Sequence, residues 1–343
     1  MGTLFAPFGV DVPVLAAPMA GGPTSPELVS AAAGAGSFGF LAGGYKSPED
    51  LAAQLRTARG SGIVFGVNLF APNPTPVAAQ AYRQYAAALQ PVAERLEVTL
   101  PAGEPIEDDD HWHDKIGLLL DEPPPVASFT FGIPDRDVVV RLRRAGAIVV
   151  QTVTSPTEAL AAVENGVDGL IVQAAAAGGH SATLDPARPV PDVALPGLVT
   201  AVRGVTGVPI VAAGGIAGPD QVAAAIRAGA EAVMVGTLLL RADEAGTSAT
   251  HRAALADPRF TTTVVTHAFT GRPARALRND FTDRFGPVAP HGYPALHHLT
   301  SPIRKAAAQA GQAELLHLWA GTGFRAARTE SAATTIERLA SGL

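Results

Sequence analysis

The chain contains no cysteine among its 343 residues. This absence excludes disulfides, thiolate nucleophiles, cysteine-ligated zinc and iron–sulfur clusters. Runs of basic residues are also absent, and the formal net charge is −6. Because proteins that bind nucleic acid need clustered Lys and Arg to contact phosphates, we expect no nucleic-acid partner.

Long apolar runs are lacking as well. No uncharged apolar stretch reaches the ~20 residues that a helix needs to cross a bilayer, so we expect no membrane partner. The N-terminal MGTLFAPFGVDVP has neither the basic start nor the long apolar segment of a signal peptide. These features predict a cytoplasmic protein.

Material for a large buried core is abundant, with 47% hydrophobic and 16% charged residues. Short, continuously apolar runs recur along the chain, which is typical of strands covered on both faces. They predict eight strands, over residues 12–20, 38–44, 63–70, 126–132, 147–153, 169–174, 209–215 and 232–240.

Alanine-rich stretches of helical character separate most of these runs. Most of the stretches open with Ser or Asp beside Pro and close with Gly, the usual helix start and stop signals. Strict alternation of strand and helix implies a parallel sheet with right-handed crossovers. Eight units favour a closed (β/α)8 barrel, or TIM barrel. The rival is an open doubly wound sheet, which usually carries an early G-x-G-x-x-G that is missing after the first run.

Three segments depart from the regular spacing. Residues 71–119 form an excursion after the third strand, and residues 175–193 form a long loop after the sixth. The tail has helical pieces at 243–256, 303–317 and 330–340 around a turn-rich middle. We therefore predict a barrel made of 1–70, 120–241 and about 312–343, with a mostly helical substrate-side lid subdomain at 242–311.

Glycines lie at the ends of the seventh and eighth predicted strands. They are Gly214 and Gly215 in one case, and Gly236, followed by Thr237, in the other. Glycine lets backbone N–H groups approach an anion, and the loops after these two strands usually bind phosphate in such barrels. The pattern favours a phosphate-bearing ligand over ordinary turns.

Two amides, Asn68 and Gln173, end apolar strands, and a buried amide must be hydrogen-bonded. A flat heteroaromatic ring would satisfy both; the alternative is bonding to neighbouring loop backbone. Pro18 and Met19, after the first strand, are placed to lie against a ring face, or Met19 is simply core.

His180 is the leading catalytic candidate, because it follows two glycines on a loop that leaves the barrel mouth. The alternative is a surface histidine. The run from Asp108 to His113 opens a predicted helix, so we expect no metal there. Tyr293 and Lys305 are weaker candidates that reach a substrate from the tail. The alternatives for Arg272, Arg275 and Arg278 of FTGRPARALRNDF are that they face an anion, form a solvated face or make structural hydrogen bonds.

With these features the chain resembles a known family, the nitronate monooxygenases, formerly called 2-nitropropane dioxygenases. The resemblance is strongest to class I of that family. The resemblance covers nearly the whole chain and agrees in order and spacing. It rests on these stretches: APMAGGPTSPELVSAAAGAGSFGFLAGGY, FGVNLF, the AGGH loop, PIVAAGGI, VMVGT, FTGRPARALRN, YPALHHLTSPIR and LWAGTG.

The resemblance implies an FMN-dependent barrel enzyme that oxidises alkyl nitronates, such as propionate 3-nitronate, with O2 to a carbonyl compound and nitrite. It implies catalysis by His180 and a monomer or homodimer. It also implies that FMN contacts these residues: Pro18, Met19, Ala20, Asn68, Gln173, Gly178, Gly179, Gly214, Gly215, Gly236 and Thr237.

Other activities stay open beside this reading. FMN-dependent NAD(P)H:quinone reductases and enoyl-thioester reductases share the fold and the AGGH loop. A phosphate-binding isomerase or aldolase without flavin, and a flavin-binding protein without turnover, are further alternatives.

The family loop reads Gln-Gly-x-Glu-Ala-Gly-Gly-His, but this chain has Ala174 and Ala176 where glycine and glutamate are usual. The missing carboxylate is expected to lower the pKa of His180 or loosen its orientation. A second departure is Thr322, where the family often has Gln.

Overall fold

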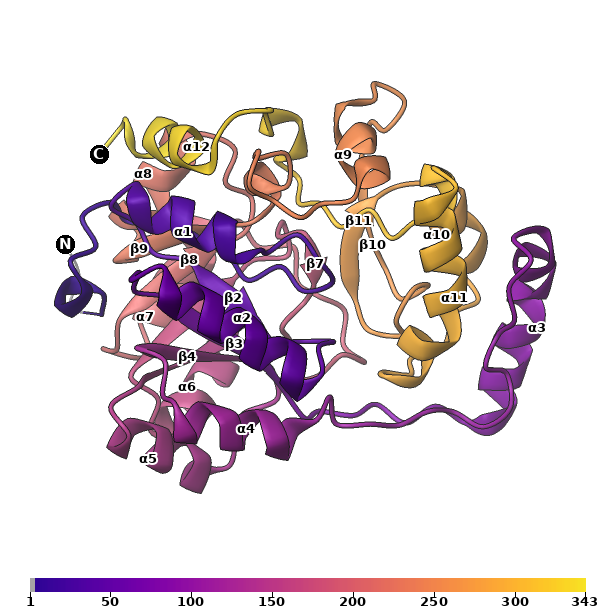
Figure 1. Cartoon of the computed structure of the whole chain (residues 1–343), viewed down its shortest axis with the longest axis horizontal. Helices are drawn as coiled ribbons and strands as arrows, with labels where there is room; N and C mark the ends of the chain where they lie inside the picture. Colours follow the sequence, from indigo (N-terminus) through magenta and orange to yellow (C-terminus); the bar gives the residue numbers. More distant parts are fainter. Residues whose placement is uncertain (1–3) are drawn as a thin grey trace.

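The computed structural model describes residues 4–343, so residue 1, the expected start of the barrel, lies outside the described part. All eight predicted strands are present, and they are parallel and neighbour one another in one sheet (Figure 1). Their bounds are β1 (Val14–Ala16), β2 (Phe40–Ala42), β3 (Gly66–Ala71), β4 (Val126–Phe131), β5 (Ile148–Val153), β6 (Gly169–Gln173), β8 (Ile210–Ala213) and β9 (Ala232–Val235).

The sheet closes on itself. Its strand order is β1-β9-β8-β6-β5-β4-β3-β2, and a parallel bridge between Ala16 and Gly39 joins the two ends. The N–H of Ala16 donates to the carbonyl of Phe38 at 2.9 Å across this seam. The predicted (β/α)8 barrel is therefore confirmed, and the open sheet is not formed.

A helix follows each barrel strand and covers the outside. Ser25, Ser47 and Ser155 each cap a helix by accepting a hydrogen bond from the backbone N–H three residues later, as the Ser-Pro signals predict. The helices are α1 (Pro26–Gly34), α2 (Pro48–Gly60), α4 (Trp112–Asp121), α5 (Arg136–Arg144), α6 (Pro156–Glu164), α7 (Leu195–Arg203), α8 (Pro219–Arg227) and α12 (Ala332–Ala340).

Alternate strand residues supply two separate cores, which explains why the strands read as unbroken apolar runs. Val149 and Leu170 belong to the cluster that includes the helices. Val150 and Ile171, their chain neighbours, belong to the cluster inside the barrel. Phenylalanines from the N-terminal segment and from around β2 pack in this inner cluster. The ring centre of Phe38 lies 5.1 Å from that of Phe5, in a tilted pair, and 5.1 Å from that of Phe40, edge to face.

The excursion and the tail add further elements, drawn beside the barrel in Figure 1. Three strands, which the sequence did not suggest, form an antiparallel sheet in the order β10-β11-β7. The added elements are α3 (Ala79–Arg95), β7 (Gly179–His180), η2 (Thr237–Leu239), α9 (Ala249–Ala256), β10 (Thr263–Thr266), β11 (Ala274–Leu277), α10 (Asp280–Phe285), α11 (Ala295–Gln309), η3 (Ala313–Leu315) and η4 (Phe324–Ala326); a short η1 (Ala6–Phe8) precedes β1.

Helix α3 of the excursion packs with the tail rather than standing alone. Tyr82 and Tyr85 share a hydrophobic cluster with Phe269 and Phe281, and the Tyr85 hydroxyl donates to the Ala268 carbonyl at 2.5 Å. Figure 1 shows α3 beyond α10 and α11 at the same side of the molecule. The excursion and the tail thus share one core, and the domain boundaries given above stay a prediction.

The tail helices differ in extent from the prediction. The helix expected over 303–317 begins at Ala295 and ends at Gln309, with Pro302 in its interior. Burial of Leu296, Leu299 and Ile303 at helical spacing outweighs the cost of an internal proline, about 3 kcal/mol. The piece expected over 243–256 is helical only from Ala249. No helix among residues 4–343 is long and apolar enough to span a bilayer.

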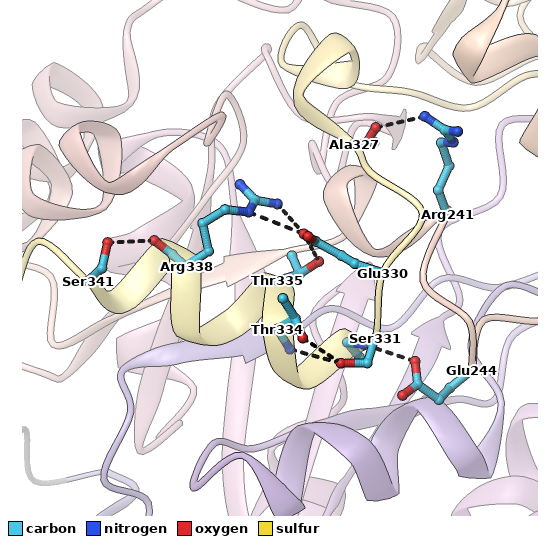
Figure 2. Close-up of polar contacts among 10 residues, drawn as sticks. Arg241, Glu244, Ala327, Glu330, Ser331, Thr334, Thr335, Arg338 and Ser341 are labelled. Carbon is cyan, nitrogen blue, oxygen red and sulfur yellow. Dashed lines mark hydrogen bonds and ion pairs between the residues drawn. The ribbon is translucent and has the colours of Figure 1, made fainter.

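Helix α12 follows the tail elements and packs on the barrel, and hydrogen bonds fix its first residues (Figure 2). Ser331 caps it by accepting from the N–H of Thr334 at 3.1 Å. Glu244, in the segment after β9, accepts from the N–H of Ala332 at 2.9 Å. Glu330, just before the helix, pairs at 2.6 Å with Arg338, about two turns into it.

We expect Ile336→Ala to destabilise the protein. Ile336 is fully buried in the cluster between helices and strands. Its truncation leaves a cavity under α12 and should lower the free energy of unfolding by about 2–5 kcal/mol. Urea unfolding measures the loss. Glu337→Ala, one residue along and exposed, should change it by less than about 0.5 kcal/mol; equal effects of the two changes would contradict the packing described.

Candidate active site

A cavity of about 640 Å³ opens at the ends of the barrel strands. This volume lies within the ~300–1,000 Å³ typical of small-molecule sites. Loops after β1, β3, β6, β8 and β9 line one side, and residues of the tail line the other. Nearly all sequence-predicted site residues line it, namely Pro18, Met19, Ala20, Asn68, Gln173, Gly178, Gly179, His180, Gly214, Gly215, Gly236, Thr237 and Lys305.

Tyr293 is the exception, because it lies behind the cavity wall. Its ring meets that of His180 at a centroid distance of 6.1 Å, and its hydroxyl donates to the hydroxyl of Tyr45 at 3.5 Å. Tyr45 does line the cavity and stacks on His297 at 4.0 Å. Burial raises the pKa of both tyrosine hydroxyls, that of Tyr45 to about 12.

The glycine-rich strand ends offer free donors. Among residues 4–343, no protein acceptor is found for the backbone N–H groups of Gly215, Gly236 and Thr237. Gly214 and Gly215 have φ of 103° and 76°, a region that side chains rarely adopt. Unpaired N–H groups at a barrel mouth suit an anionic oxygen, so this corner fits the phosphate of a cofactor.

Gly178 lets two loops approach closely. A Cβ at this position would lie 2.5 Å from the backbone nitrogen of Gly321. The N–H of Gly321 in turn donates to the Thr237 hydroxyl at 2.9 Å. The segment near residue 321 therefore covers the loop after β6 and ties it to the loop after β9.

The two strand-end amides are used differently. Asn68 is buried and donates through Nδ2 to the hydroxyls of Ser128 at 2.9 Å and Thr130 at 3.0 Å. Gln173 donates to the His180 carbonyl at 3.2 Å and accepts from the N–H of Ala182 at 2.8 Å. Gln173 thus bonds to the backbone of a neighbouring loop, the second of the two alternatives, because its amide joins the carbonyl of His180 to the N–H of Ala182.

His180 is held by strand pairing as well. It pairs with Ala274 in the antiparallel β7–β11 ladder, and its Nε2 lies 2.9 Å from the hydroxyl of Thr270. Its ring also contacts those of Phe131 and Trp319, at 5.5 Å and 5.3 Å. The loop that left the barrel without a helix cap is therefore a short strand of a second sheet.

Several anchors of this loop were missed by sequence reasoning. Glu158 of α6 accepts from the N–H of Leu184 at 2.8 Å, and Asn73 donates to the carbonyl of Leu184 at 2.9 Å. Arg275 donates to the Ala175 carbonyl at 2.6 Å, and Arg272 donates to that of Thr183. These residues come from distant parts of the sequence, so only the arginines, already noted as structural or anion-binding, carried any signal.

Burial and positive charge set the protonation of His180. Burial first, and then the guanidinium groups of Arg272 and Arg304, lower its pKa to about 3. The imidazole is therefore neutral at physiological pH, with one ring nitrogen free to accept a hydrogen bond.

The ionisable side chains of the cavity wall are basic; burial lowers the pKa of His180, His251, His297 and His317, so these imidazoles are neutral and the cations of the wall are Arg304 and Lys305. Within the described part of the chain, none of its lining residues is an Asp or Glu. Basic and imidazole side chains line it instead: His180, His251, His297, His298, Arg304 and Lys305, with His317. Arg304 is buried and donates to the carbonyl of His297 at 2.7 Å, not to a carboxylate. Such a wall favours an anionic ligand.

The two unusual alanines lie at defined places in the loop. Ala174 is buried, and its N–H donates to the carbonyl of Ala213 at 2.9 Å. Ala176 lines the cavity, and its carbonyl accepts from the N–H of Thr322 at 3.0 Å. A Cβ added to Gly215 would lie 3.1 Å from the Cβ of Ala176. Position 176 therefore borders the glycine corner.

Comparison with known families gives a consistent result. A family model described as nitronate monooxygenase matches residues 5–342. A probable nitronate monooxygenase of Staphylococcus aureus strain JH9 is 34% identical over 334 residues, which cover 96% of this chain and 94% of the relative. The corresponding protein of strain Newman is 33% identical over the same length.

Solved structures agree with this result. The nitroalkane oxidase of Streptomyces ansochromogenes is 44% identical, with a TM-score of 0.93 over 99% of this chain and 98% of that one. FabK from Thermotoga maritima has a TM-score of 0.76 at 23% identity over 99% of this chain and 94% of that one. The second likeness is one of fold alone.

We expect Gly178→Ala to force the covering segment away from the loop after β6, because the new methyl would overlap the backbone near residue 321. The cost should be about 1–3 kcal/mol of stability, seen as a lower thermal midpoint. Gly103→Ala serves as the control, since nothing lies within 4 Å of its added Cβ. An unchanged midpoint in the Gly178 variant would rule out the close approach.

Proposed function

This chain belongs to the nitronate monooxygenase family, and from that premise we propose that it oxidises alkyl nitronates with O2 to a carbonyl compound and nitrite, using bound FMN. The single observation that carries this proposal is the charge of the cavity wall. Cationic and imidazole side chains line the cavity, and no carboxylate does among the described residues. A nitronate is an anion, and such a wall stabilises it.

The residues at the barrel mouth fit FMN. The unpaired N–H groups of Gly215, Gly236 and Thr237 would hold its phosphate. Met19 and Pro18 would lie beside its ring system, and Asn68 would offer its amide oxygen, since Nδ2 is already donated to Ser128 and Thr130. When bound, the flavin would supply the redox step by taking electrons from the substrate and passing them to O2.

His180 would act on the substrate as a neutral hydrogen-bonding group. A general base works best when its pKa lies near the working pH. With a pKa of about 3, His180 is a poor base for taking a proton from the carbon of a neutral nitroalkane. A substrate that arrives already deprotonated, as a nitronate, requires no such base.

The tail residues suit a second anionic group on the substrate. Lys305 lies exposed at the rim, one residue beyond the buried Arg304. A carboxylate, as in propionate 3-nitronate, would meet these two cations. Tyr293 would act indirectly, by supporting Tyr45 and the His180 ring.

We expect oxygen uptake with nitronate, at least about tenfold slower uptake with the parent nitroalkane at equal concentration, and no rapid anaerobic bleaching of the flavin by NAD(P)H. An oxygen electrode and stopped-flow absorbance measure the three. His180→Asn should lower kcat/KM for nitronate by about 10- to 100-fold, the equivalent of losing one hydrogen bond to a charged group.

The matched control is His113→Asn, an exposed histidine of α4 that should leave kcat/KM unchanged. Rapid bleaching by NAD(P)H without nitronate turnover would replace the proposal with a reductase. A purified protein that releases no FMN on heating would exclude both flavin reactions.

A further inference from the structure

Arg272 is a buried cation that pairs directly with no carboxylate of the described residues, and the charge of Glu158 acts on it only from a distance. Its side chain is 0% exposed, and among residues 4–343 its guanidinium forms no ion pair with a carboxylate. Removing an ion from water costs several kcal/mol unless other contacts offset the loss. Burial lowers its pKa to about 10, so it stays charged at neutral pH.

The contacts of Arg272 all concern the His180 loop and its neighbours. Nη2 donates to the Thr183 carbonyl and Nε to that of Ser181 at 3.5 Å, while Nη1 has no partner. The guanidinium carbon lies 4.1 Å from the centre of the Phe131 ring, which also contacts His180. Phe131 itself has a φ of 81°, a rare and strained conformation for a bulky residue.

We propose that Arg272 is a positioning residue: it holds the loop after β6 in place and supplies a positive charge, paired directly with no carboxylate, to the His180 side of the cavity. The inference rests on the proposed function for its substrate, an anion. A pure loop anchor would need hydrogen bonds only. The unpartnered Nη1 and the missing carboxylate are costs that a structural role alone does not offset.

Arg275, three residues further along in β11, provides the contrast. It donates to the Ala175 carbonyl at 2.6 Å and to the Thr263 hydroxyl at 3.1 Å, so it too anchors the loop. Neither arginine lines the main cavity, but only the charge of Arg272, and not that of Arg275, is among the influences on His180. Arg275 is thus an anchor of the loop that has no electrostatic effect on His180.

Other groups around His180 must be kept constant in a test. Arg304 is the second cation that lowers its pKa, and it comes from α11. The imidazoles of His297 and His317 and the hydroxyl of Tyr293 also lie near, and Thr270 is its hydrogen-bond partner. Replacing Arg272 alone leaves all of these in place.

The experiment compares Arg272→Gln, Arg272→Met and Arg272→Lys with Arg275→Met in the flavin-loaded protein. Histidine-labelled samples are titrated from about pH 2 to 9 by NMR, a range that includes the low wild-type pKa of His180, and the His180 signal is identified by its loss in His180→Asn. With the positive charge removed, imidazolium is less disfavoured, so the His180 titration should move to higher pH in the Gln and Met variants. It should stay at the wild-type position in the Lys and Arg275 variants.

Steady-state kinetics provide the second readout. KM for nitronate should rise about tenfold in Arg272→Gln, with a smaller change in kcat, because the charge acts on the bound anion. Arg272→Lys should keep KM within about threefold. An equal loss in the Lys and Gln variants, or a His180 titration that Arg275→Met moves as far, would overturn the electrostatic role and leave an anchor only.

Two outcomes are kept apart by this design. If the wild-type protein does not oxidise nitronate, the proposed function fails while the His180 titration still tests Arg272. If neither neutral variant folds, Arg272→Lys decides: unchanged titration and KM uphold the charge, and altered values show that the geometry of the guanidinium is what matters.

Discussion

The pairing of β7 with β11 is the constraint on which the site depends. Two residue pairs, Ala274 with His180 and Arg275 with Gly179, join the loop after β6 to the tail of the chain. This ladder, together with the hydrogen bonds of Arg272 and Arg275 to the loop, fixes the tail over the barrel mouth and holds His180 in place. The N–H of Ser181, which donates to the Pro273 carbonyl at 2.8 Å, extends the same junction.

Such a short ladder is marginal alone, because two-stranded sheets need a hydrophobic face or other support. Here the support comes from buried side chains that bind loop backbone. Gln173 binds the loop at the His180 carbonyl, Glu158 binds the N–H of Leu184, and Asn73 binds the carbonyl of Leu184. The loop is rich in Ala and Gly and has few polar side chains of its own, so these anchors satisfy its backbone groups.

The barrel could be read from the sequence because its signals are local. Apolar runs and Ser-Pro caps act within a few residues, and they placed all eight strands and most helices. The strand β7 was missed because it has only two residues and pairs with β11 more than 90 positions further along the chain. The strands β10 and β11 were also missed, although they are close in sequence and pair with each other. Helix α3 was missed within a segment dominated by Pro and acidic residues, although its Tyr82, Tyr85 and Leu89 follow helical spacing.

For the site, the glycines, amides and His180 were predictable because strand ends meet at one edge of a parallel barrel. The roles of Glu158, Asn73 and Arg272 were not, since each depends on which distant carbonyl or N–H it meets. The same limit applies to Gln173, whose partners lie within its own loop and could not be told from a cofactor by sequence alone.

The structure changes the effect expected from the alanine at position 176. The missing glutamate was expected to act on His180, yet burial and then Arg272 and Arg304 lower the pKa of that histidine. The Cβ of Ala176 points toward the place where a side chain on Gly215 would begin, which is the corner proposed for phosphate. A carboxylate there would add a negative charge beside an anion. With alanine, both corners of the cavity keep one sign: N–H donors at the glycine-rich strand ends and unpaired cations around His180. The proposed function thus assigns two anions to this cavity, a cofactor phosphate and a substrate that arrives already ionised.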